Sequence, residues 1–208
     1  MFNAIRIFTA FISLATGSLS PNATAVVADQ APVVVMIDMS PEEQAETLRI
    51  VGYFAEAGLP LPPVTFRHHL DPAGCNGSDG LHRSVGSRSV IELCNAGPGS
   101  GTDRVILHEL AHAWSFHSLT DERKAAFKEL RGWKYWLDYD NADWADNGAE
   151  QAAEIIVWAL SDHPVQVIKV DHNTCTELLA GYITLTGLTP LHGYTKLCEP
   201  PITTAIRS

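Results

Sequence analysis

Residues 105–114 read VILHELAHAW, an apolar stretch that contains two histidines four positions apart. On an α-helix, residues four apart lie on one face, so His108 and His112 can present both imidazoles to one metal ion. Glu109 points about 100° away, close enough to reach a water on that ion without binding the ion. The apolar neighbours indicate a buried helix, where polar groups without partners are costly. The stretch predicts a metal-binding helix, and the alternative is two core histidines bonded to backbone or water.

A catalytic zinc site takes three protein ligands and leaves one position open for water, so a third ligand must lie elsewhere. The metzincin pattern would require glycine at 115 and histidine at 118, but these positions are Ser115 and Ser118. His117 is one residue out of phase, and we interpret it as a residue on the surface or near the site. A Gly-Thr-x-Asp stretch downstream would supply an aspartate ligand, but Gly-Thr-Asp occurs only upstream, at 101–103.

Residues 147–160, NGAEQAAEIIVWAL, contain two acids four positions apart, Glu150 and Glu154, on a strongly apolar helical pattern. Carboxylates turned into such a helix need partners, as the buried histidines do. One metal site would satisfy both sets of residues. Periodicity does not choose which glutamate binds the metal, because both lie on the same helix face.

With these two blocks, the sequence resembles the gluzincins, the thermolysin-like zinc peptidases in which a glutamate from a later helix is the third ligand. The resemblance implies that His108, His112 and Glu150 bind Zn²⁺ and that Glu109 is the catalytic base. It implies that Glu154 hydrogen-bonds and orients His108, and so it favours Glu150 as the ligand. The chain is much shorter than thermolysin and lacks the Asn-Glu-x-x-Ser/Asp form around the third ligand. It is more similar to small secreted zincins of actinobacteria.

The resemblance implies a zinc-dependent metallopeptidase that hydrolyses peptide bonds. Zinc lowers the pKa of its bound water toward about 7, and Glu109 accepts the proton as the water attacks the substrate carbonyl. Tyr135, Tyr139 and His163 flank the glutamate helix and are candidates for the donor that stabilises the oxyanion. Zincins pair the substrate backbone with an exposed edge strand before the motif helix, a role predicted here for SVIEL, residues 89–93. The alternative function is a secreted zinc-binding protein with a structural or non-catalytic metal site.

The order of the predicted elements indicates an α+β fold. Apolar, β-branched segments predict strands at 32–38, 63–70 and 89–95, and the stretch between the last two is Gly-rich and polar. Helix signals occur at 40–57, 102–119, 120–130, 146–160 and, more weakly, 175–184. We therefore expect a zincin-like domain with helices on one face of a small mixed sheet. One helix would carry HExxH and a later one the third ligand.

The N-terminus has the three-part pattern of a secretory signal peptide. Arg6 precedes an apolar run at 7–19, and the small residues Ala23 and Ala25 predict cleavage after residue 25. Residues 26–208 would then be one metallopeptidase domain that is secreted, either extracellular or in the cell envelope, and free of the membrane.

The charge balance narrows the possible partners. The formal net charge is -10, with 24 acidic and 14 basic residues, which argues against nucleic acid or anionic lipid. We expect a peptide or protein substrate. The acidic stretch DYDNADWADN, residues 138–147, predicts a loop before a helix, because an EF-hand begun at Asp138 would require glycine where Asp143 stands.

The four cysteines, an even number in an exported chain, predict two disulfides. Three connectivities are possible, and the two short local loops, Cys75–Cys94 and Cys175–Cys198, are the preferred pairing. A thiolate metal site is the alternative, but the cysteines lack the close spacing that such sites use.

Overall fold

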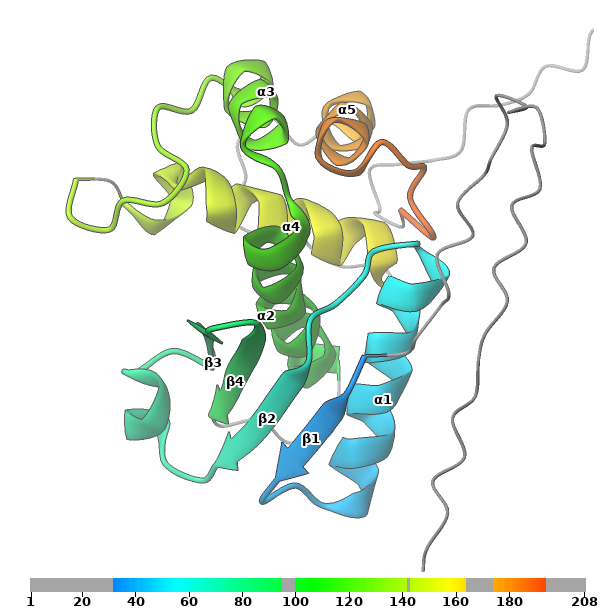
Figure 1. Ribbon diagram of the computed structural model, residues 1–208, viewed down its shortest axis with the longest axis vertical. Helices are drawn as coiled ribbons and strands as arrows, with labels where there is room; N and C mark the ends of the chain where they lie inside the picture. Colours follow the sequence, from blue (N-terminus) through cyan, green and yellow to red (C-terminus); the bar gives the residue numbers. More distant parts are fainter. Residues whose placement is uncertain (1–31, 95–99, 142, 164–173, 194–208) are drawn as a thin grey trace, which may run out of the picture. The chain divides into compact units, whose positions relative to one another are not determined.

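A four-stranded mixed sheet forms the base of the fold in the computed structural model, which describes residues 32–94, 100–141, 143–163 and 174–193 (Figure 1). The strands are β1 (Val34–Ile37), β2 (Val64–His69), β3 (Gly80–Val85) and β4 (Arg88–Cys94). Their order is β1-β2-β4-β3. β1, β2 and β4 are parallel, and β3 pairs antiparallel with β4. The three strands predicted from the sequence are confirmed.

The prediction that residues 89–93 form the exposed edge strand is wrong. These residues belong to β4, which lies between β2 and β3, and Ile91, Leu93 and Cys94 are buried. The edges of this sheet are β1 and β3, and β3 lies within the stretch that was expected to be a polar connection. Its sequence GLHRSV carries the polar side chains that protect sheet edges, and this composition hides it from a search for apolar strands.

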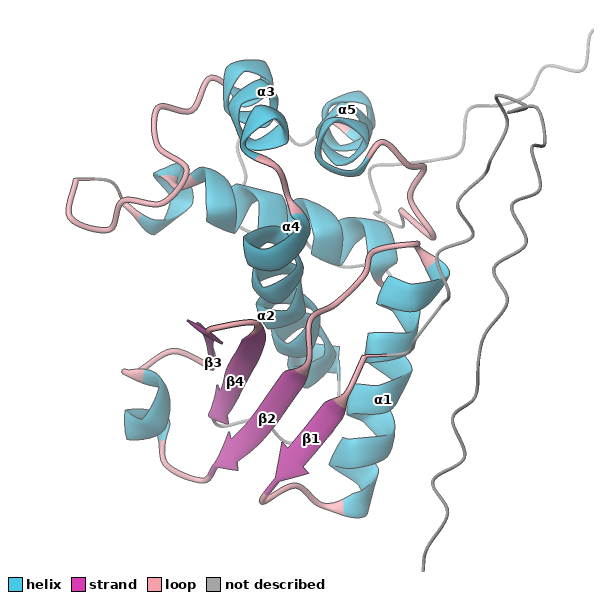
Figure 2. Cartoon of the chain, viewed as in Figure 1, coloured by secondary structure: helices cyan, strands magenta, loops and turns pink. Residues whose placement is uncertain are grey.

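Five helices are present among the described residues (Figure 2). They are α1 (Pro41–Glu56), α2 (Ser100–Ser118), α3 (Asp121–Arg131), α4 (Gly148–Leu160) and α5 (Cys175–Thr186), with short 3-10 turns at Pro72–Cys75 and Trp144–Asp146. Ser40 and Thr120, the first residues of the predicted helical ranges 40–57 and 120–130, cap α1 and α3. α2 begins at Ser100, slightly before the predicted start at residue 102, so Asp103 lies in its first turn.

The helices form more than one layer above the sheet. α2 packs against β3 and β4, and α4 packs across α2 (Figure 1). α3 and α5 contact α4 and each other. The mixed sheet and the five helices among the described residues are compatible with the predicted α+β class.

α4 is the most buried helix, since every residue from Gly148 to Leu160 is buried. Small side chains at Ala149, Ala152 and Ala153 allow close packing against neighbouring helices. Glu150 and Glu154 are consequently only 2% and 1% exposed as residues, and each carboxylate needs a partner inside the protein.

The predicted disulfide between Cys75 and Cys94 is confirmed. Cys175 is disulfide-bonded as well, and its predicted partner Cys198 lies outside the described residues. The predicted signal peptide, residues 1–25, also lies outside them. No helix in the described part of the chain combines the length and the apolar character needed to cross a membrane.

Candidate metal centre

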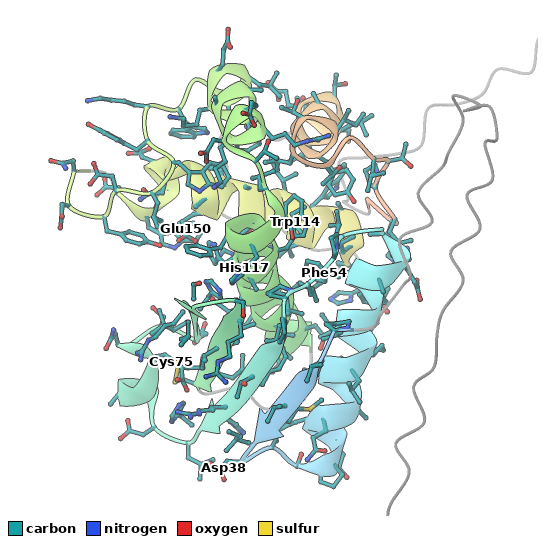
Figure 3. The ribbon with its side chains drawn as sticks, viewed as in Figure 1. Asp38, Phe54, Cys75, Trp114, His117 and Glu150 are labelled. Carbon is teal, nitrogen blue, oxygen red and sulfur yellow. A yellow bond between two sulfur atoms is a disulfide. The ribbon has the colours of Figure 1, made fainter. Side chains whose placement is uncertain are left out.

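Three donor atoms from α2 and α4 converge in the interior. Nε2 of His108 lies 3.0 Å from Oε2 of Glu150, and Nε2 of His112 lies 3.1 Å from the same oxygen. The two Nε2 atoms are 3.0 Å apart. Figure 3 marks Glu150 on α4, close to α2. The three residues form a group that could hold a metal ion.

Helix geometry and aromatic packing fix the two imidazoles. His108 and His112 are one turn apart on α2, with ring centroids 4.7 Å apart at an interplanar angle of 82°. Trp144 stacks on the His108 ring at 5.9 Å, and His82 stacks on the His112 ring at 6.2 Å. Each ring is therefore held from outside the helix as well as by it.

Glu154 lies on the other side of His108. Its Oε1 atom is 3.1 Å from Nδ1 of His108, and the same oxygen accepts a hydrogen bond from Arg104. The two nitrogens of the His108 ring thus face two different glutamates. Arg104 supplies the positive charge that the buried Glu154 carboxylate requires.

The charges of the site act on its pKa values. Burial lowers the pKa of His108, but hydrogen bonds with Glu150 and Glu154 outweigh this effect and raise it to about 10. Burial raises the pKa of Glu150, but hydrogen bonds with His108 and His112 dominate and hold it well below its ordinary range. Both shifts favour the charged forms, a protonated His108 beside an ionised Glu150.

Glu109 lies beside the donor group and is not one of its three members. Its side chain is largely buried and lines the same cleft as His108, His112 and Glu150. Burial raises the pKa of Glu109, while the two histidines and a hydrogen bond from the backbone N–H of His82 act to lower it. The carboxyl is thus placed at the donor group with a raised affinity for a proton.

The cleft that contains the donor group has a volume of about 740 Å³. β3 contributes one wall, including Gly80 and His82, and the connection between α3 and α4 contributes another. Three exposed side chains with large apolar parts also line it: Phe116, Leu137 and Tyr139. The donor group is therefore reachable from solvent through a partly apolar opening.

Of the three candidates for an additional donor, Tyr139 is the one that lines the cleft. Its hydroxyl donates a hydrogen bond to Oε1 of Glu150 at 2.5 Å, and burial together with this bond raises the pKa of Tyr139. Tyr135 instead forms a backbone bridge with Asn147. His163 follows the far end of α4 and contacts Asp162 at 2.8 Å.

His117 and the carboxylates of the acidic stretch 138–147 are not members of the donor group. Nε2 of His117 is 3.4 Å from Oγ of Ser84. In the acidic stretch, Asp138 accepts hydrogen bonds from the following backbone, and residue 142 lies outside the described residues. Within the described ranges, His108, His112 and Glu150 are the single group of three His, Cys, Asp or Glu residues close enough to hold an ion.

Arg104, His82 and Trp144 contact the glutamate and histidine side chains of the site, and the sequence did not identify them. Arg104 lies four residues before His108, so helical periodicity could have placed it on the same face of α2. His82 lies on β3, and it could not be assigned because that strand was not recognised.

Comparisons with models of protein families, with curated proteins and with solved structures gave no match for this chain.

Proposed function

We propose that this chain is a secreted zinc-dependent metallopeptidase in which His108, His112 and Glu150 bind the metal. The observation that carries the proposal is the convergence of these three donor atoms with the Glu109 carboxylate in one accessible cleft. A purely structural metal site has no use for a free carboxylate beside the ligands.

The donor set supports zinc. Two imidazole nitrogens and one carboxylate oxygen are ligands that catalytic zinc sites use, whereas calcium and magnesium prefer sets made of oxygen. Tetrahedral zinc with bonds of about 2.0–2.2 Å places neighbouring ligand atoms about 3.3–3.5 Å apart. The three atoms at 3.0–3.1 Å are a few tenths of an ångström closer, so a small outward shift of the side chains would accommodate the ion.

The residues of the cleft suit hydrolysis of a peptide bond. Bound zinc would supply the Lewis acidity that makes water a nucleophile near neutral pH. Glu109 would accept the proton of the attacking water and then pass it to the leaving amine. Glu154 would hold His108 in orientation. The Tyr139 hydroxyl, which donates its one proton to Glu150 in this structure, would turn to donate it to the substrate carbonyl oxygen and stabilise negative charge there.

An extended peptide has a natural place at the edge of the sheet. β3 pairs with β4 on one side, and its residues Gly80, Leu81 and His82 line the cleft. Backbone groups on the other side of an edge strand can pair with a peptide, as in β-strand addition. β3 therefore takes the role of the strand that pairs with substrate, a role that was predicted from the sequence for the interior residues 89–93. The apolar opening at Phe116 and Leu137 favours apolar substrate side chains next to the cleaved bond.

The proposed secretion of the protein is supported mainly by its N-terminal sequence. Residues 1–25 have the signal-peptide pattern, and the Cys75–Cys94 disulfide is compatible with an oxidising compartment.

The proposal is tested by metal analysis and casein cleavage on the mature protein, Glu109→Gln and Glu150→Ala, with the exposed Glu129→Gln as control. We expect one zinc per chain, full zinc with lost turnover in Glu109→Gln, and loss of zinc in Glu150→Ala. A protein that carries iron or no metal would contradict the zinc assignment. Zinc with undiminished cleavage in Glu109→Gln would contradict the mechanism. Zinc without any cleavage by the unmodified chain would favour the non-catalytic zinc-binding protein.

A further inference from the structure

Strand β3 and helix α2 approach each other most closely at Gly80. A Cβ atom added to Gly80 would lie 2.6 Å from Cγ1 of Val105 and 2.9 Å from both Cγ and Oε1 of Glu109. These distances are far inside van der Waals contact, so no side chain fits here without movement of α2 or of the Glu109 side chain. The backbone of β3 therefore packs directly on the carboxylate of Glu109.

Position 80 requires glycine because there is no space for a larger side chain. Gly80 is not among the glycines with positive φ, so its backbone conformation is open to any residue. Gly86, in the turn between β3 and β4, shows the opposite case. Its φ is +62°, and an added Cβ would have no neighbour within 4 Å.

The start of β3 is fixed in place by its neighbours. Gly80 is paired with Leu93, and the backbone N–H of Cys94 donates a hydrogen bond to the carbonyl of Asp79 at 2.8 Å. Cys94 is also joined to Cys75 by the disulfide, and both cysteines are buried. Because these contacts oppose sliding of the strand, a side chain at position 80 would displace the side chains of Val105 and Glu109.

We propose that Gly80 is a positioning residue for Glu109. Its missing side chain lets β3 hold the Glu109 carboxylate against the donor group of His108, His112 and Glu150. Val105 and Glu109 lie one turn apart on the same face of α2, so this contact fixes both the helix and the carboxylate. The inference rests on the proposed role of Glu109 as the general base and adds the element that sets its position.

The test compares Gly80→Ala with Gly86→Ala, which strains the same hairpin away from the site. In Gly80→Ala we expect full zinc content, a KM within about twofold, and kcat lower by about 100-fold, because a shift of about 1 Å in a reacting group costs this much. Gly86→Ala should lose stability with kcat unchanged. A Gly80→Ala protein with full zinc and unchanged kcat overturns the proposal.

A second variant covers the case in which Gly80→Ala does not fold. Gly80→Ala combined with Val105→Ala removes the closest clash and leaves the one with Glu109. It should keep zinc and turn over about 100-fold more slowly than Val105→Ala alone. Equal rates for these two proteins overturn the proposal.

Binding of acetohydroxamate gives a readout without turnover, because this zinc chelator releases a proton that Glu109 is placed to accept. Gly80→Ala should lose affinity in the same direction as Glu109→Gln, and Gly86→Ala should not. If the unmodified protein holds zinc and cleaves no peptide, the proposed function fails. The hydroxamate measurement then still decides whether Gly80 positions Glu109: equal affinity in Gly80→Ala and the unmodified protein overturns that role.

Discussion

Nδ1 of His108 lies 3.1 Å from Oε1 of Glu154, while Nε2 of the same ring lies 3.0 Å from Oε2 of Glu150. One imidazole is thus held between two carboxylates that are four residues apart on α4. The outer carboxylate is neutralised by Arg104. This arrangement gives the two glutamates different environments: Glu150 faces both histidines, and Glu154 faces one histidine and an arginine.

Glu154→Gln should weaken zinc binding about 10- to 100-fold, as loss of a hydrogen-bond partner behind a histidine ligand does. Glu150→Gln should weaken it more, because it replaces a proposed ligand. Zinc affinity is measured by competition with a chromophoric chelator, with Glu177→Gln on α5 as control. If Glu154→Gln costs more affinity than Glu150→Gln, the roles of the two glutamates are reversed.

Zinc affinity should rise with pH through the neutral range. The pKa of His108 is raised to about 10 in the metal-free group, so this ring holds a proton at neutral pH. A histidine that binds zinc through Nε2 and donates Nδ1–H to a carboxylate is neutral, so metal binding must release that proton. Titrations in buffers of different ionisation enthalpy count the protons released. Release of no proton near neutral pH would contradict the ion pair described here.

Tyr139→Phe should lower kcat about 10- to 100-fold, because it removes a donor at the reacting carbonyl. Zinc content should stay full, since Tyr139 hydrogen-bonds to Glu150 through Oε1, the oxygen that does not face the histidines. Tyr135→Phe is the matched control from the same connection, outside the cleft. Steady-state kinetics with a peptide substrate give kcat for Tyr139→Phe and Tyr135→Phe. Equal kcat values for the two variants would show that Tyr139 does not take part in the reaction.

Helical periodicity explains why so much of this centre could be predicted from the sequence. His108 and His112, like Glu150 and Glu154, are four residues apart in apolar surroundings, and burial forces such groups to find one another. However, periodicity predicts only which residues share a face of one helix. It does not predict which helices pack against each other. The convergence of Glu150 with the two histidines depends on the packing of α4 across α2.

The edge strand shows where sequence reasoning failed. β4 is apolar because its side chains Ile91, Leu93 and Cys94 are buried, whereas β3 is an edge strand with a more polar sequence. A search for β-branched, apolar runs finds β1, β2 and β4 and misses a polar edge strand such as β3. Gly80 was missed for the same reason: its importance lies in a contact with Glu109, some thirty residues later in the chain.

Replacement of Cys75 and Cys94 by alanine should lower the free energy of unfolding by about 3 kcal/mol on the chain-entropy estimate. The bridge closes a loop of sequence separation 19 and joins the 3-10 turn Pro72–Cys75, which precedes β3, to the end of β4. Urea unfolding of the intact and replaced proteins measures the difference. A loss well below 1 kcal/mol would show that the β3–β4 pairing holds this segment without the bridge.

A cluster of charges at the start of α2 sets a pH dependence of stability away from the metal centre. Asp103 is 5% exposed and lies 2.7 Å from Nη2 of Arg49, which also contacts Glu46. Burial and the neighbouring Glu46 raise the pKa of Asp103 to about 6, against the opposing effect of Arg49. The folded protein therefore holds a proton on Asp103 in a pH range where the unfolded chain has released it.

The ordinary pKa of an aspartate is 3.8, and that of Asp103 in the folded protein is about 6. Between these two pH values the folded state binds more protons than the unfolded state. Asp103 therefore makes the free energy of unfolding fall as pH rises through this window. Asp103→Asn removes the titrating group, so its stability should fall less across the same window. Urea unfolding of both proteins at several pH values measures the free energy of unfolding. The effects of the other titrating groups are common to both proteins and cancel when the two free energies are subtracted. Asp121→Asn, whose carboxylate is 95% exposed on α3, is the control and should follow the unmodified protein. Parallel stability curves for Asp103→Asn and the unmodified protein would show that Asp103 is already ionised at the lower end of the window, held so by Arg49.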